Sequence, residues 1–164
     1  MKIQSGVSLF DLKALRYEFP SIVDDEYSSN WLYIDVKAAT GHGSWCFSRP
    51  CLLNWEVMAI AKYFEAMANE TASERGLGFT EPNLYFTKND HNDLLIHFDC
   101  ESVPPWFESS AKVPTFIMLF EMSPVSLRKA ALELRKQLEL VPLRAGAVAK
   151  KVVRWSDLTK IYVD

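Results

Sequence analysis

Two histidines and two aspartates lie close together in the sequence, and they form its densest group of side chains able to transfer protons. Asp90, His91, Asp93 and His97 fall within the stretch DHNDLLIH. A histidine beside a carboxylate can act as a general acid or base. The same stretch is also typical of a polar hairpin turn, because Asn and Asp side chains readily bond to nearby backbone groups. We therefore predict no catalytic residue, and keep a small hydrolytic enzyme that uses His91 or His97 as an alternative.

The cysteines and histidines show none of the spacings that are typical of a metal site. Cys46, Cys51 and Cys100 are odd in number and contain no CxxC pair, so we predict reduced thiols. The three histidines lack the i, i+4 spacing of a helical zinc-binding pair. GxSxG, GxxxxGK[ST], GxGxxG and HExxH motifs are also missing from the sequence. We predict neither a metal nor another cofactor.

A second group of residues is suited to binding rather than to catalysis. In the stretch YEFPSIVDDEYSSNW, three consecutive acids, Asp24, Asp25 and Glu26, separate two apolar runs. Such a cluster is either a solvated hairpin turn or a surface for a basic partner, and its composition alone does not decide between them.

Three aromatic residues present a similar choice. Trp31 and Tyr33 alternate with apolar residues that define the opposite face of a strand, and Trp106 follows two prolines on a predicted loop. These rings either pack under a helix or loop, or contact a partner, because Trp and Tyr contribute much of the energy at protein interfaces. A carbohydrate- or peptide-binding module would use the same three residues, so it is a second alternative.

Length and composition predict one domain. A chain of 164 residues with 49% hydrophobic content can bury one core but is short for two. No apolar run reaches the roughly 18 residues of a membrane span, and the N-terminal stretch MKIQSGVSLFDLK lacks the apolar segment of a signal peptide. We therefore expect a cytoplasmic protein without a membrane segment.

Charge is distributed unevenly along the chain. Residues 1–100 contain 14 acidic and 8 basic side chains, a net charge of −6, whereas residues 144–164 contain 5 basic and 2 acidic side chains, a net charge of +3. An acidic body repels phosphate backbones, so we predict no direct binding of nucleic acid. We also predict a domain at residues 1–143, followed by a basic C-terminal extension at 144–164 whose structure the sequence leaves open.

Alternating apolar residues predict the strands that would hold these side chains. The pattern favours strands within residues 8–20, 31–37, 44–47, 84–86 and 94–98. Within residues 8–20 the buried parity changes once, so we expect either a bulge or two short strands there. Residues 115–122 are apolar at both parities, which predicts a central strand covered on both faces.

Two helical patterns complete the predicted fold. The first follows Asn54, a candidate N-cap, and the second begins at Ser123–Pro124. The apolar positions of the two helices are Val57, Ile60, Ala61, Phe64 and Met67, and Leu127, Ala130, Ala131, Leu134 and Leu138. The order of elements predicts a single α+β domain, with a mainly antiparallel sheet of about six or seven strands and two amphipathic helices.

Several short motifs, taken together in their order, resemble a known family. They are LRYEFP (15–20), DEYSSNWLYIDV (25–36), SWCFSRPCLLNWE (44–56), FTEPNLYF (79–86), PPW (104–106) and FEMSPVSLRKAALELR (120–135). The series is similar to that of the WapI-type immunity proteins, and the resemblance covers roughly residues 9–143. Members of this family are small cytoplasmic bacterial antitoxins against the C-terminal nuclease domain of a wall-associated, contact-dependent toxin.

The resemblance implies a binding protein rather than an enzyme, with a protein toxin as its partner. A nuclease needs a basic surface to bind nucleic acid, so its inhibitor gains speed and specificity from an acidic surface. The predicted toxin-binding residues are Asp24, Asp25, Glu26, Tyr27, Trp31, Tyr33 and Trp106. The oligomeric state is left open.

Overall fold

The computed structural model describes residues 1–109 and 114–144, which form two four-stranded antiparallel sheets and two α-helices. The first sheet contains β1 (Lys2–Ser5), β2 (Ser8–Tyr17), β3 (Trp31–Thr40) and β4 (Gly43–Leu53) in that order. The second contains β5 (Gly76–Leu77), β6 (Leu84–Lys88), β7 (Leu94–Phe98) and β8 (Phe116–Phe120) in that order. Helix α1 (Asn54–Ala68) connects the two sheets, and α2 (Pro124–Leu140) follows β8.

This architecture confirms the prediction of a single α+β domain with antiparallel strands and two helices. The predicted strand number was slightly too low, because the described residues contain eight strands. The short strands β1 and β5 have only four and two residues, and segments of that length carry little periodic signal. The predicted division at residue 143 stays a prediction, because residues 145–164 lie outside the part of the chain that the structure describes.

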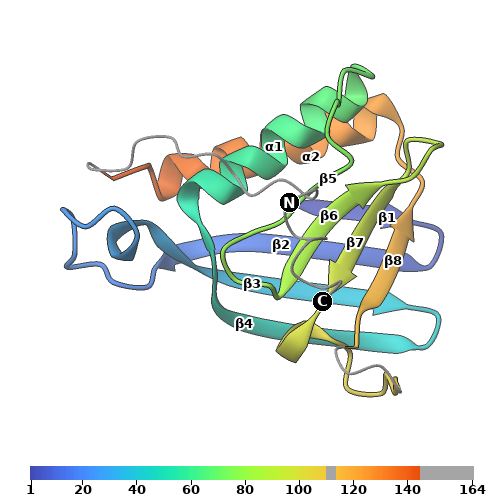
Figure 1. Ribbon diagram of the computed structural model, residues 1–164, viewed down its shortest axis with the longest axis horizontal. Helices are drawn as coiled ribbons and strands as arrows, with labels where there is room; N and C mark the ends of the chain where they lie inside the picture. The colour runs from blue at the N-terminus through green and yellow to red at the C-terminus, as the bar shows by residue number, and fades with distance from the viewer. Residues whose placement is uncertain (110–113, 145–164) are drawn as a thin grey trace, which may run out of the picture.

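The two sheets and the helices enclose one core. In Figure 1 the strands of the second sheet cross those of the first at a steep angle, and both helices lie along the same side of the molecule. The ring of Phe10 on β2 meets Phe86 on β6 and Phe98 on β7, at centroid distances of 6.0 and 5.9 Å. Helix α1 adds Phe64, whose ring lies 5.9 Å from that of Phe86. The core therefore joins the N-terminal and C-terminal halves of the chain.

The predicted bulge is present in β2. The pairing register between β2 and β3 shifts between Ala14 and Arg16, so the consecutive residues Leu15 and Arg16 are both exposed, between buried Ala14 and half-buried Tyr17. An extra residue in one strand reverses the side-chain parity beyond it. This is why the two halves of the stretch 8–20 show opposite apolar patterns.

Both predicted helices are confirmed, and each predicted apolar position on them is buried. Helix α2 begins as expected: the backbone N–H of Ser126 donates to Ser123 Oγ at 3.2 Å, and Pro124 occupies the first helical position. Helix α1 begins one residue earlier than predicted, because Leu53 is its N-cap and Asn54 is already helical. The Asn54 side chain instead donates to the carbonyl of Val141, a distant partner that a local pattern cannot reveal.

The prediction of a central strand at residues 115–122 was wrong. Strand β8 lies at the edge of the second sheet, paired with β7. Its inward residues Met118 and Phe120 are buried, but Ile117 and Leu119 are 50% and 46% exposed. Apolar residues on both faces of a strand do not distinguish a central strand from an edge strand, because exposed apolar side chains are common on protein surfaces.

Within the described residues, no helix combines the length and the apolar character that crossing a membrane requires.

Candidate functional site

The predicted acidic cluster lies in residues 18–30, which connect β2 to β3 and are called the β2–β3 loop below. Figure 1 shows this loop at the left of the view, beside the start of α1. The backbone N–H of Glu18 donates to the Trp31 carbonyl at 2.9 Å and closes the loop at its base. A short 3₁₀ helix at Ser28–Asn30 leads into β3. The segment is therefore a folded loop and not a tight hairpin turn.

Asp25 organises the second half of the loop. Its Oδ1 accepts a hydrogen bond from the Ser28 backbone N–H at 2.6 Å, and its carbonyl accepts one from the Ser29 N–H at 3.1 Å. Hydrogen bonds from the side chain and backbone of Ser28 hold the pKa of the Asp25 carboxyl below its ordinary value. The buried side chain of Asn30 donates to the Glu26 carbonyl at 2.9 Å. Asp25 thus has a structural role, while its charge stays on the surface.

The outer surface of the loop combines acidic and apolar side chains. Asp24 and Asp25 are exposed, and so are Phe19, Val23 and Tyr27, while Glu26 is half-buried. Sequence reasoning assigned Phe19 to the preceding strand and gave no role to Val23. The signal that could have revealed both is the position of apolar residues within a loop that also carries three acids.

Aromatic contacts tie the loop to the rest of the fold. The ring of Tyr27 meets Trp55, in the first turn of α1, edge-on at 5.6 Å. Trp31 and Tyr33 follow the loop in β3 and are half-buried. The guanidinium carbon of Arg16 lies 4.2 Å above the Tyr33 ring. The Trp31 backbone N–H donates to the Tyr27 carbonyl at 3.2 Å, so these two residues lie where the loop joins β3, and Tyr33 follows two residues further along the strand.

The structure does not bring Trp106 to this surface. Its ring packs edge-on against Trp45 at 5.5 Å and lies beside Gly43. Gly43 pairs with Thr40 at the end of β3 opposite Trp31. Thr40 lies nine residues after Trp31 along β3, which corresponds to roughly 30 Å. The three aromatic residues of the proposed carbohydrate- or peptide-binding module therefore do not form one surface.

His97 is buried within the second sheet. Its Nε2 lies 2.7 Å from Thr87 Oγ1, and its ring stacks on Tyr85 at 4.1 Å. Burial lowers the pKa of His97 to about 4, so the imidazole is neutral at physiological pH. These contacts give His97 a packing role in the sheet.

The other members of the predicted acid–base group lie in the β6–β7 turn. His91 is exposed, and its backbone N–H donates to Asn89 Oδ1 at 3.0 Å. Asn89 Nδ2 donates to Asp93 Oδ2 at 2.9 Å, and Asp90 forms an ion pair with Arg75 at 3.3 Å. Both carboxylates thus bond to partners other than a histidine.

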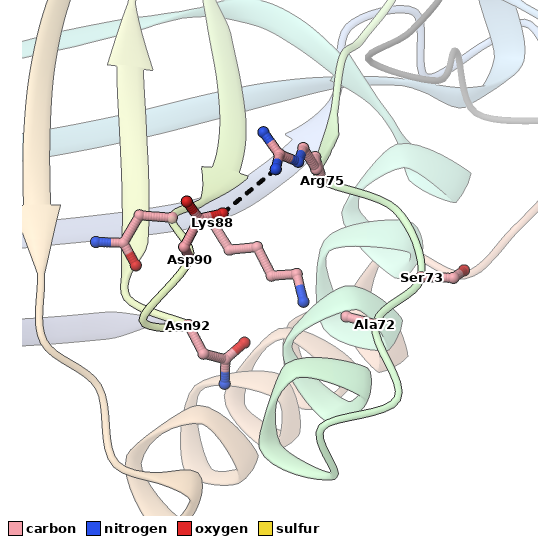
Figure 2. Close-up of a pocket in the computed structure, with 7 residues that line it drawn as sticks. Ala72, Ser73, Arg75, Lys88, Asp90 and Asn92 are labelled. Carbon is pink, nitrogen blue, oxygen red and sulfur yellow. Dashed lines mark hydrogen bonds and ion pairs between the residues drawn. The ribbon is translucent and has the colours of Figure 1, made fainter.

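A shallow pocket of about 290 Å³ lies beside this turn. Figure 2 shows Arg75, Lys88 and Asp90 in its lining, with the Arg75–Asp90 ion pair drawn between them. Asn92 also lines the pocket, and its side chain donates to the Met67 carbonyl at 3.1 Å. No histidine is among the lining residues. The pocket therefore does not contain the histidine–carboxylate pair that the enzymatic alternative would use.

The cysteines are free thiols in the structure. Cys51 is buried, which raises the pKa of its thiol to about 12, while Cys46 and Cys100 are exposed. Among residues 1–109 and 114–144, no group of three His, Cys, Asp or Glu side chains is arranged to hold a metal ion.

Comparison with protein families finds a match that covers most of this chain. The family described as the immunity protein WapI-like family matches residues 2–142. Comparisons with curated proteins and with solved structures find no match. The family match spans both sheets, both helices and the whole β2–β3 loop.

Proposed function

The chain belongs to the immunity protein WapI-like family, and on that premise we propose that it neutralises a nuclease toxin by binding its C-terminal toxic domain through the β2–β3 loop. Membership of this family supports an immunity role and a protein toxin as partner. Two further statements belong to the proposal itself: that the toxin is a nuclease, and that this chain binds it through the β2–β3 loop. The family is generally one of binding proteins, and we expect no catalytic step in neutralisation.

The observation that carries this proposal is the mixed surface of the β2–β3 loop. Protein interfaces generally combine an apolar centre with a polar rim. Phe19, Val23 and Tyr27 supply exposed apolar area next to the carboxylates of Asp24 and Asp25. A nuclease surface that binds phosphate groups is basic, so acids at the rim would speed encounter and favour the correct orientation. Trp31 and Tyr33 extend this surface onto β3, whereas Trp106 lies too far away to be included.

Neutralising the acids of the loop is expected to slow toxin binding. In the triple variant Asp24→Asn, Asp25→Asn, Glu26→Gln, association should slow about ten-fold at low salt, because charge steering raises association rates by at least that factor. The salt dependence of the rate should flatten as well. Asparagine at position 25 keeps an oxygen for the Ser28 N–H bond. The measurement is stopped-flow association with the cognate toxin domain across a salt series.

A second triple variant controls for total charge. Glu70, Glu81 and Glu121 are exposed and lie on other parts of the molecule, so their replacement by Gln removes the same charge without touching the loop. This control should associate at nearly the wild-type rate. If both triple variants behave alike, the loop is only a solvated connection and the proposed surface is wrong.

The enzymatic alternative makes a different prediction. We expect His91→Ala and His97→Gln to leave neutralisation unchanged within about two-fold, because neither histidine bonds to the carboxylates of the β6–β7 turn in a pair suited to proton transfer. Glutamine at position 97 can still bond to Thr87 Oγ1. The measurement is survival of cells that express the toxin domain together with each variant. Loss of survival with a variant whose circular dichroism is unchanged would restore a catalytic or ligand-binding role.

A further inference from the structure

The chain that leaves α2 crosses the base of the β2–β3 loop. These residues, Val141–Arg144, are called the α2 exit segment below. The Val141 carbonyl accepts a hydrogen bond from Asn54 at the start of α1, and the Pro142 carbonyl accepts one from the Tyr17 hydroxyl at the end of β2. The exit segment is therefore fixed against both α1 and the strand that leads into the loop.

Arg144 makes the contacts that reach into the loop itself. Its guanidinium carbon lies 3.5 Å from the centroid of the Tyr17 ring. Its Nη1 donates to the carbonyls of Phe19 at 3.1 Å and Ile22 at 2.6 Å. Its backbone N–H donates to Asn30 Oδ1 at 3.0 Å. One residue thus bonds to the beginning, the middle and the end of the loop.

We propose that Arg144 is a positioning residue that holds the β2–β3 loop in its toxin-binding conformation. This inference rests on the proposed function, because it assumes that the loop contacts the toxin. The two backbone carbonyls that the Arg144 side chain binds belong to Phe19 and to Ile22, the residue before Val23. Fixing these carbonyls restrains the backbone that carries the exposed side chains of Phe19 and Val23. A loop ordered before binding loses less conformational entropy when the toxin binds, so affinity rises without any new contact.

The chemistry of the contact requires arginine. One guanidinium nitrogen donates to two carbonyls while the planar group stacks on Tyr17, and a lysine ammonium cannot reproduce this combination. Hydrogen bonds that involve a charged donor are also stronger than neutral ones. Arg144 is half-buried beneath the loop, and its charge would repel a basic toxin. We therefore assign it to positioning and not to direct toxin contact.

The family match ends at residue 142, so it does not include Arg144. Its contacts with Tyr17, Phe19, Ile22 and Asn30 are contacts of this chain alone.

Removing the Arg144 side chain is expected to loosen the loop in the absence of toxin. In Arg144→Ala, the backbone amides of Ile22, Ser29 and Asn30 should exchange with deuterium about ten-fold faster, since charge-assisted bonds to two carbonyls are removed. Arg144→Lys should accelerate exchange to a smaller extent. The matched control is Arg128→Ala, which removes a guanidinium bonded to the Ala68 carbonyl and to Asn69 Oδ1 at the other end of α2. Loop exchange should be unchanged in this control.

Toxin binding provides the second readout. Arg144→Ala should weaken binding of the cognate toxin domain about ten-fold, while Arg128→Ala should bind like wild type. If Arg144→Ala does not fold, the comparison is made with Arg144→Lys, which keeps the charge. Unchanged loop exchange in the folded variants would overturn the inference without any use of the toxin.

The two readouts together separate this inference from the proposed function. Faster loop exchange with unchanged toxin affinity would overturn the positioning role. If the triple acidic-loop variant also bound normally, the fault would lie in the proposed surface. If that variant bound slowly, the surface would stand and only the role of Arg144 would be wrong.

Discussion

Replacing Phe10 with alanine is expected to lower the free energy of unfolding by about 3–5 kcal/mol. The Phe10 side chain is 0% exposed, and its ring meets those of Phe86 and Phe98 from the second sheet. Its removal would leave a cavity where the two sheets meet, and the twisted sheets cannot close together fully to fill it. The effect is large because less apolar surface is buried and because both partner rings would then face an empty space.

Urea unfolding followed by circular dichroism measures this change in stability. Phe19→Ala is a matched control, since it deletes the same atoms from a ring that is 39% exposed in the β2–β3 loop. We expect this control to change stability by less than about 1 kcal/mol but to weaken toxin binding. Equal losses of stability in both variants would show that Phe10 does not connect the two sheets.

The sequence predicted those features of the fold that depend on neighbouring residues. A helix shows its buried face as a 3.6-residue period and a strand shows it as alternation. This is why the buried positions of α1 and α2, the faces of β3 and the bulge near Leu15 were all predicted. The polar turn between β6 and β7 was also predicted, because the residues that form it are consecutive.

The features that could not be predicted depend on residues far apart in the chain. The edge position of β8 follows from the strand order of the second sheet, which no local pattern contains. The distance between Trp31 and Trp106 follows from the packing of Trp106 beside the β3–β4 turn. The contacts of Arg144 with the β2–β3 loop span more than 110 residues. Sequence reasoning thus proposed the acidic loop as a site but could not show what holds it in place.

A buried carboxylate connects the first turn of α1 to the chain before β6. Glu56 is 3% exposed, and its Oε2 accepts a hydrogen bond from the Leu53 backbone N–H at 2.8 Å. Its Oε1 accepts two more from Thr80, from the backbone N–H at 2.7 Å and the hydroxyl at 2.8 Å. The structure shows that both of its oxygens act as acceptors.

Glu56→Gln is therefore expected to destabilise the protein by about 1–3 kcal/mol, although the two side chains have the same shape. An amide has one accepting oxygen, and its NH₂ group can only donate. Whichever way the amide is oriented, its NH₂ group faces a backbone N–H of Leu53 or Thr80. One buried donor is left without an acceptor, and such a group costs more than an average hydrogen bond contributes. Urea unfolding at pH 7 measures the loss of stability.

The pH dependence of this destabilisation tests the electrostatics of Glu56. Burial raises the pKa of Glu56 above its usual value of 4.5. The folded state then retains a proton that the unfolded state has released, so this group's contribution to stability falls as the pH rises from 4.5 through the raised pKa. The stability difference between wild type and Glu56→Gln should accordingly shrink over that range.

Glu65, on the same helix, provides a control of opposite sign. Its carboxylate accepts two hydrogen bonds from Arg135, at 2.7 and 2.8 Å, and the side-chain bonds lower the pKa of Glu65. The contribution of Glu65 is therefore present above pH 4.5 and disappears as the pH falls. Over the same pH series, we compare the free energy of unfolding of wild type with that of each variant. The difference between wild type and Glu65→Gln should grow with rising pH, whereas the difference between wild type and Glu56→Gln should shrink. If both differences grow with pH, the hydrogen bonds from Leu53 and Thr80 outweigh burial at Glu56, and the pKa of Glu56 is lowered rather than raised.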